Sequence, residues 1–129
     1  MKKWVKWVGW TALVLALVGA LNWGLVALGW NLVTWLFGVS TMTTIVYALV
    51  GLSAVYSIFW FFNHKMKLNA LEWTATVLVI VGALNWGLVA LGWNMVDAIF
   101  GAASMLARIV YGLVGIAALY SIWVMWKNK

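Results

Sequence analysis

The stretch Val18–Asn31 reads VGALNWGLVALGWN, and Val81–Asn94 repeats the same fourteen residues without a change. An identical segment of this length indicates two copies of one structural unit, because self-similarity at a fixed spacing is the signature of repeat architectures. The match continues outside this core, where Ile45-Val46-Tyr47 recurs as Ile109-Val110-Tyr111. The spacing is 63 residues in the first half of the unit and 64 in the second half. The second copy therefore has one extra residue between these halves.

The composition indicates a membrane protein. Hydrophobic residues make up 67% of the chain and charged residues only 8%, whereas soluble domains have roughly 25% charged residues. Four apolar stretches each reach the ~20 residues that a helix needs to cross the hydrocarbon layer. They lie at Trp4–Leu28, Met42–Phe62, Leu71–Leu91 and Met105–Trp126. None alternates polar and apolar residues as barrel strands do. We therefore predict an all-α integral membrane protein with four transmembrane helices.

Lysines set the expected orientation. They precede the first stretch, separate the second from the third and follow the fourth, as Lys2, Lys3, Lys6, Lys65, Lys67, Lys127 and Lys129. All three segments lie on one side of the membrane, and the positive-inside rule makes that side cytoplasmic. We expect a multi-pass protein of a bacterial or archaeal cytoplasmic membrane with both termini inside. The outer connectors hold only Asp97 and Arg108, which we expect to form a weak surface ion pair.

Each repeat is predicted to be a helix, an outer connector and a second helix. The repeats cover residues 8–62 and 71–126, with a cytoplasmic linker at 63–70. Two spans return the chain to its starting side, so both repeats have the same orientation, about a pseudo-two-fold axis along the membrane normal. Within the connectors, Asn31 and Asn94 are good helix N-caps, and Gly38 is a suitable stop. We predict a short interfacial helix in each connector, with a dip into the bilayer as the alternative.

Asn22 and Asn85 are the polar side chains deepest in the first and third spans. Tyr47 and Tyr111 lie at nearly the same depth in the returning helices, counting 1.5 Å per residue. We predict direct Asn22–Tyr47 and Asn85–Tyr111 hydrogen bonds that hold the two helices of each repeat together. The alternative is a small channel or facilitator for ions or neutral solutes, with Asn22 and Asn85 near the constriction, since polar groups inside a membrane often mark function.

Small residues form a stripe along the first and third spans. Its members recur at intervals of three or four and are Ala16, Ala20, Gly24 and Ala27, with Ala83, Gly87 and Ala90 in the second copy. Such stripes let helices approach closely, where packing and hydrogen bonds drive association. We predict that these faces pack the helices and mediate homo-oligomerisation within the lipid bilayer. The function favoured by the sequence is therefore a structural or interaction role.

The remaining residues exclude several classes of site. The chain has no cysteine, so disulfides and thiolate chemistry are absent. His64 has no second histidine at ligand spacing, and Glu72 suits a helix N-terminus. Most of the twelve tryptophans fall at the span boundaries, where such residues form interfacial belts. The lysines are spread over three segments and form no basic face for nucleic acid. We expect no enzymatic activity, no cofactor and no metal.

The repeated VGALNWGLVALGWN segment, a short connector and the run Ile109–Gly115 together resemble the YuzA-like family of small bacterial membrane proteins. This family is a domain of unknown function whose members are typically one two-helix unit. The chain thus resembles two members in tandem, which implies fold and location but no activity. The exact identity of the repeats fits a recent duplication, a larger assembly or a designed sequence, and these alternatives stay open.

Overall fold

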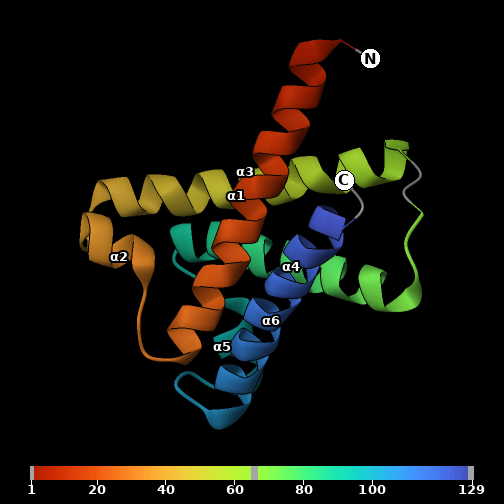
Figure 1. Cartoon of the computed structure of the whole chain (residues 1–129). Coiled ribbons are helices and arrows are strands. Elements are labelled where there is room, and N and C mark those ends of the chain that lie inside the picture. The colour runs from red at the N-terminus through yellow and green to blue at the C-terminus, as the bar shows by residue number, and fades with distance from the viewer. Residues whose placement is uncertain (1, 65–66, 128–129) are drawn as a thin grey trace.

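The computed structural model describes residues 2–64 and 67–127, and within them the chain forms six α-helices and no strand (Figure 1). Four helices are long and apolar enough to cross a membrane. They are α1 (Lys3–Ala27), α3 (Thr41–His64), α4 (Ala70–Ala90) and α6 (Met105–Lys127). The short helices α2 (Leu32–Phe37) and α5 (Met95–Phe100) lie in the connectors. The predicted architecture of two helix–connector–helix repeats is confirmed. Lys65 and Lys129 lie outside the described residues.

The short helices lie at one end of the long helices, opposite the start of α1 and the end of α6 (Figure 1). We call the end that holds α2 and α5 the connector end. The other end, with the start of α1, the end of α3, the start of α4 and the end of α6, is the lysine end. At the connector end, Gly29 and Gly92 follow the last turns of α1 and α4, and their positive φ angles of 92° and 93° suit glycine. At the lysine end, Asn69 and Glu72 form a capping box that begins α4.

The two repeats interlock. Helices α1 and α4 lie at the centre and each contacts the other three long helices. Helices α3 and α6 flank this pair, and in the described part of the chain their backbones do not approach each other closely. The first helix of each repeat packs closely on the second helix of the other repeat, α1 on α6 and α4 on α3. Separating the repeats would therefore break most of the bundle.

Glycine pairs allow these cross-repeat helices to approach. A Cβ added at Gly115 would lie 2.5 Å from the Cα of Gly24. In the equivalent crossing, a Cβ added at Gly51 would lie 2.5 Å from the Cα of Gly87. Only a residue without a side chain fits at such a distance from a backbone atom. The small-residue positions therefore set the geometry of the α1–α6 and α3–α4 contacts, as close packing in membranes requires.

Candidate functional site

The deepest polar side chain of the first repeat holds the connector onto the bundle. Asn22 is 1% exposed, and its Oδ1 accepts a hydrogen bond of 2.8 Å from the backbone N–H of Leu32, at the start of α2. Its Nδ2 donates to Asn31 Oδ1 over 3.0 Å. Asn31 in turn donates from Nδ2 to the hydroxyl of Tyr47 on α3 over 2.8 Å. We call this set of three side chains the connector clamp.

The second repeat contains the same connector clamp. Asn85 is fully buried, accepts from the backbone N–H of Met95 and donates to Asn94 Oδ1. Asn94 donates to the hydroxyl of Tyr111 over 2.7 Å. The direct asparagine–tyrosine bonds predicted from depth are thus replaced by bonds through Asn31 and Asn94. The physical reason is that a second asparagine, at the N-cap of the connector helix, reaches into the gap between the two long helices.

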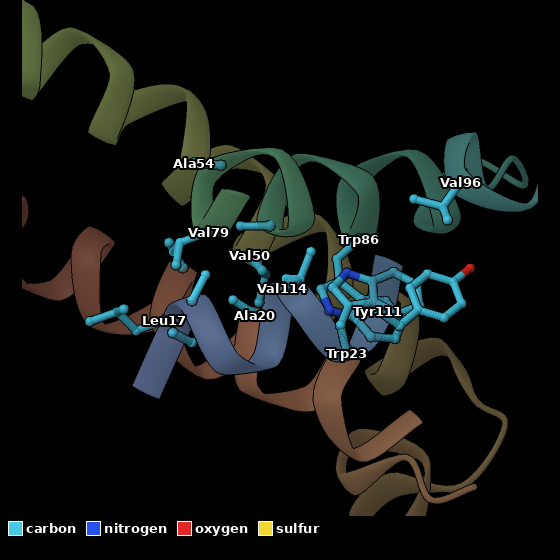
Figure 2. Close-up of a cluster of buried hydrophobic side chains, with 14 of the residues drawn as sticks. Leu17, Ala20, Trp23, Val50, Ala54, Val79, Trp86, Val96, Tyr111 and Val114 are labelled. Carbon is cyan, nitrogen blue, oxygen red and sulfur yellow. The ribbon is translucent and has the colours of Figure 1, made fainter. Parts of the chain in front are cut away.

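Aromatic rings from all four long helices form a continuous stack beside the connector clamps. Trp23 and Trp86 are the central pair, with ring centroids 3.8 Å apart and planes 10° apart. Tyr111 stacks on Trp23 and Tyr47 stacks on Trp86, each with centroids 4.3 Å apart. Figure 2 shows Trp23, Trp86 and Tyr111 lying over one another. The hydroxyl of each tyrosine therefore belongs to a clamp, and its ring belongs to the central stack, so the tyrosines join the clamps to the centre of the molecule.

Reciprocal hydrogen bonds join the two repeats at this stack. The indole N–H of Trp23 donates to the carbonyl oxygen of Gly82 over 2.7 Å, and that of Trp86 donates to the carbonyl of Gly19 over 2.8 Å. The equality of these bonds follows from the pseudo-two-fold relation of the repeats. Each buried N–H has the partner that a tryptophan needs away from water. The stack and these bonds fix α1 against α4.

The predicted small-residue stripes lie inside the bundle. Gly24 and Gly87 make the close crossings described above, and Val50 and Val114 pack beside the stripes (Figure 2). The alanines of the stripes are buried or half-buried within the chain, at Ala16, Ala20, Ala27, Ala83 and Ala90. The faces that we predicted to mediate self-association are thus used for contacts within one chain. The reason is that the second repeat already supplies the partner helix.

The two charges of the connector end contact other groups. The Asp97 carboxylate accepts a 2.6 Å hydrogen bond from the hydroxyl of Tyr111. Arg108 donates from Nε to the carbonyl oxygen of Ala27, near the end of α1, over 2.7 Å. The predicted Asp97–Arg108 surface pair is therefore wrong. A helix C-terminus offers unpaired carbonyls to a nearby cation, and a buried tyrosine hydroxyl needs an acceptor.

The sequence interpretation missed two parts of this site. It assigned Asn31 and Asn94 only to helix capping, although the amide group of a capping asparagine keeps two donors. It named no partner for Trp23, because the pattern of one helix does not tell which helix faces it. A signal was present for Trp23 and Trp86, since they lie well inside their spans and away from the boundary tryptophans. Within the described residues, no three His, Cys, Asp or Glu side chains gather where they would hold a metal ion.

The fold and the connector clamps define a duplicated, helical membrane protein. The family described as "Domain of unknown function (DUF378)" matches the chain twice, at residues 6–62 and 69–126. The chain belongs to this family and contains two tandem copies of its domain. The matched segments coincide with the two structural repeats. Together with the YuzA protein described next, this double match confirms the resemblance to the YuzA-like family.

Two curated proteins are similar to single repeats. The "Uncharacterized membrane protein YuzA" of Bacillus subtilis (strain 168) is 44% identical over 62 residues, which are 46% of this chain and 80% of that protein. The "Uncharacterized protein RP169" of Rickettsia prowazekii (strain Madrid E) is 39% identical over 54 residues, 41% of this chain and 60% of that protein. The match thus spans less than two thirds of the second relative. No solved structure matches the chain.

Proposed function

We propose that this protein is a non-enzymatic structural component of a bacterial or archaeal cytoplasmic membrane that self-associates, with both termini in the cytoplasm. The observation that carries this proposal is that Asn22 and Asn85 make hydrogen bonds within the fold. Each amide holds a connector onto the bundle, through a backbone N–H and a second asparagine. Polar groups in this arrangement stabilise the fold, and their burial, at 1% and 0% exposed, argues against contact with a passing solute.

Self-association would use the outward faces of α3 and α6, because the Gly/Ala stripes are already covered within the chain. The two flanking helices present equivalent exposed apolar residues, Leu49 and Leu52 on α3 with Leu113 and Ile116 on α6. A chain with two such faces can pair on both sides. Lipid tails are as apolar as these side chains, so shape and packing would decide between lipid and a second copy.

Counting subunits tests the structural proposal. The chain has no cysteine, so Asn63→Cys at the exposed end of α3 offers one position for a fluorophore. Labelled protein in liposomes is expected to bleach in several steps per spot, at protein densities where chance co-occupancy is negligible. Single-step bleaching at every density would overturn the proposed self-association. A double variant, Leu52→Ala with Ile116→Ala, is expected to lower the step number, whereas Leu36→Ala on α2 serves as the control.

The channel alternative has its own test. Trp23 lies six residues nearer the connector end than Leu17 does. At the depth of Trp23, the rings of the aromatic stack fill the centre of the bundle. We therefore expect proteoliposomes to release potassium, chloride and glycerol no faster than protein-free vesicles. Fast release that is lost in the double variant Asn22→Leu, Asn85→Leu would favour the channel and overturn the structural proposal.

A further inference from the structure

A pocket of about 260 Å³ opens between the long helices at the lysine end. It extends from Glu72, in the first turn of α4, to Ile80 on the same helix. Eight residues at 1.5 Å each make this depth about 12 Å. All four long helices contribute to its wall, and the lining is almost entirely apolar. Its volume is close to the smallest sites that hold small molecules, about 300 Å³.

The pocket exists because the two repeats differ at this end. In the first repeat, the ring of Trp60 covers Gly9 so closely that a Cβ on Gly9 would lie 2.6 Å from the ring. The equivalent positions in the second repeat are Glu72 and Val124. A valine in place of tryptophan leaves space, and a glutamate in place of glycine brings a charge to its edge. The pocket therefore departs from the pseudo-symmetry that governs the rest of the bundle.

The two repeats contribute different side chains to the lining of this pocket. The first repeat contributes aromatic side chains, including Trp10 and Trp60. The second contributes polar groups, Glu72, Thr76 and Ser121. The buried Oγ of Ser121 has no hydrogen-bond partner, whereas its counterpart Ser57 donates to a backbone carbonyl. An unpartnered buried hydroxyl beside a pocket calls for a ligand or a water.

The carboxylate of Glu72 has acceptor capacity for a ligand. Its Oε1 accepts one hydrogen bond, from the backbone N–H of Asn69, and an ionised carboxylate has about four acceptor positions. His64, at the same edge, stacks on Trp60 with ring centroids 3.8 Å apart. Its Nδ1 lies 2.8 Å from the Trp60 carbonyl oxygen. Since a carbonyl only accepts, Nδ1 donates in this contact, which orients the ring against Trp60.

We propose that this pocket binds a lipophilic cation, such as an alkylammonium compound. The charge of the cation would lie at Glu72, and its apolar body would lie among the lining residues between Glu72 and Ile80. A carboxylate beside tryptophan rings suits an ammonium group, which both ion pairing and cation–π attraction stabilise. The apolar depth of the pocket suits a chain or ring and excludes inorganic cations. This site is independent of the proposed structural role, because it needs neither self-association nor a path across the membrane.

Binding of radiolabelled octyltrimethylammonium to the purified full-length protein tests this site. We expect saturable binding that unlabelled cation displaces and that uncharged 1-nonanol, at equal concentration, does not. Glu72→Gln is expected to weaken binding at least tenfold, because it removes the charge. Glutamine also completes a capping box, so the start of α4 is preserved. Val124→Trp restores the first-repeat residue, keeps the charge and is expected to abolish binding by filling the pocket.

The controls separate a specific site from general affinity. Asp97→Asn changes the carboxylate at the connector end and is expected to leave binding unchanged. Thr76→Leu introduces the residue that the first repeat has at this position, Leu13, and is also expected to weaken binding. It replaces Val124→Trp as the test if that variant is unstable. Equal displacement by 1-nonanol would mean that a neutral acyl chain fills the pocket and would overturn the cation proposal. Unchanged binding by Glu72→Gln, or no saturable binding to the wild-type chain, would overturn it as well.

Discussion

The connector end and the lysine end of the bundle differ in how strictly the two repeats agree. At the connector end, Asn22, Asn31 and Tyr47 make the same bonds as Asn85, Asn94 and Tyr111. At the lysine end, Trp60 closes over Gly9, whereas Val124 and Glu72 leave a pocket. The same fold thus tolerates different chemistry at the lysine end, whereas the connector clamps have the same chemistry in both repeats.

Burial explains this difference. The clamp residues bond within their own repeat and the central tryptophans bond to the other repeat, and a change at either place would leave a polar group inside the bundle without its partner. At the lysine end, the pocket edge lies near the water boundary, where a charged glutamate can stay hydrated. Residues that are identical in the two repeats are therefore those that stabilise the fold, and residues that differ lie where the fold tolerates substitution.

The largest expected effect concerns the glycine crossings, which are equivalent in the two repeats. Gly51→Ala and Gly115→Ala each place a Cβ 2.5 Å from a backbone Cα, which cannot move aside as a side chain does. We expect each variant to lose about 3 kcal/mol, the upper end of typical overpacking costs. The measurement is unfolding in mixed micelles titrated with SDS. Gly112→Ala, with nothing within 4 Å, is the control and is expected to be neutral.

The two glycine variants also test the equivalence of the repeats. Equal losses would support a bundle in which each crossing contributes alike. A loss at Gly51 with none at Gly115 would contradict the interlocked arrangement and indicate that only α3 and α4 pack as closely as described.

The next effect concerns the connector clamps, where the repeats also agree. Asn22→Ala and Asn85→Ala each leave a buried backbone N–H without a partner and remove one of the hydrogen bonds to an asparagine Oδ1, which keeps its N-cap bonds. We expect each to cost about 2 kcal/mol, since an unpaired buried group costs about 1–3 kcal/mol and bonds in membranes give about 0.6–2 kcal/mol. Hydrogen exchange at the Leu32 and Met95 amides should accelerate in the matching repeat alone. Asn63→Ala, at an exposed position, is the control.

Much of this architecture is predictable because insertion into a membrane depends on local composition. Apolar length, lysine distribution and the identical segments predict the four long helices and the repeats, and the N-cap pattern at Asn31 and Asn94 predicts α2 and α5. Depth alone also brings Asn22 and Tyr47 into one network. These features follow from transfer free energies and backbone capping, which are properties of short segments.

The partners across the repeats are not predictable from the same patterns. The contact of Trp23 with Trp86 depends on which helices become neighbours, and a single helical pattern leaves that choice open. The bridging role of Asn31 depends on how far the connector folds back over α1. The pocket beside Glu72 depends on the absence of a large side chain at Val124, a residue far away in the sequence. Each of these features follows from tertiary packing.

A smaller effect separates the two tyrosines and sharpens the contrast between the repeats. Tyr111 donates to Asp97, whereas the first repeat has Thr34 at the position of Asp97. We expect Tyr111→Phe to cost about 1 kcal/mol more than Tyr47→Phe, because hydrogen bonds to charged groups are stronger than neutral ones. In an Asp97→Thr background the two costs should become equal. If the difference persists there, the carboxylate is not its cause.

The smallest effect concerns Arg108, which stands where the first repeat has Thr44. Its guanidinium is exposed and donates to the carbonyl of Ala27 near the C-terminal end of α1. Arg108→Thr is expected to cost about 0.5 kcal/mol, as for a cation near an exposed helix C-terminus, and the loss should shrink at high salt. Arg108→Lys keeps the charge but loses the planar Nε–H, so it should recover part of the loss. A loss of unfolding free energy larger than that of the connector-clamp variants would mean that a contact present in one repeat stabilises the fold more than the contacts present in both. The residues identical in the two repeats would then not be the ones that stabilise the fold most.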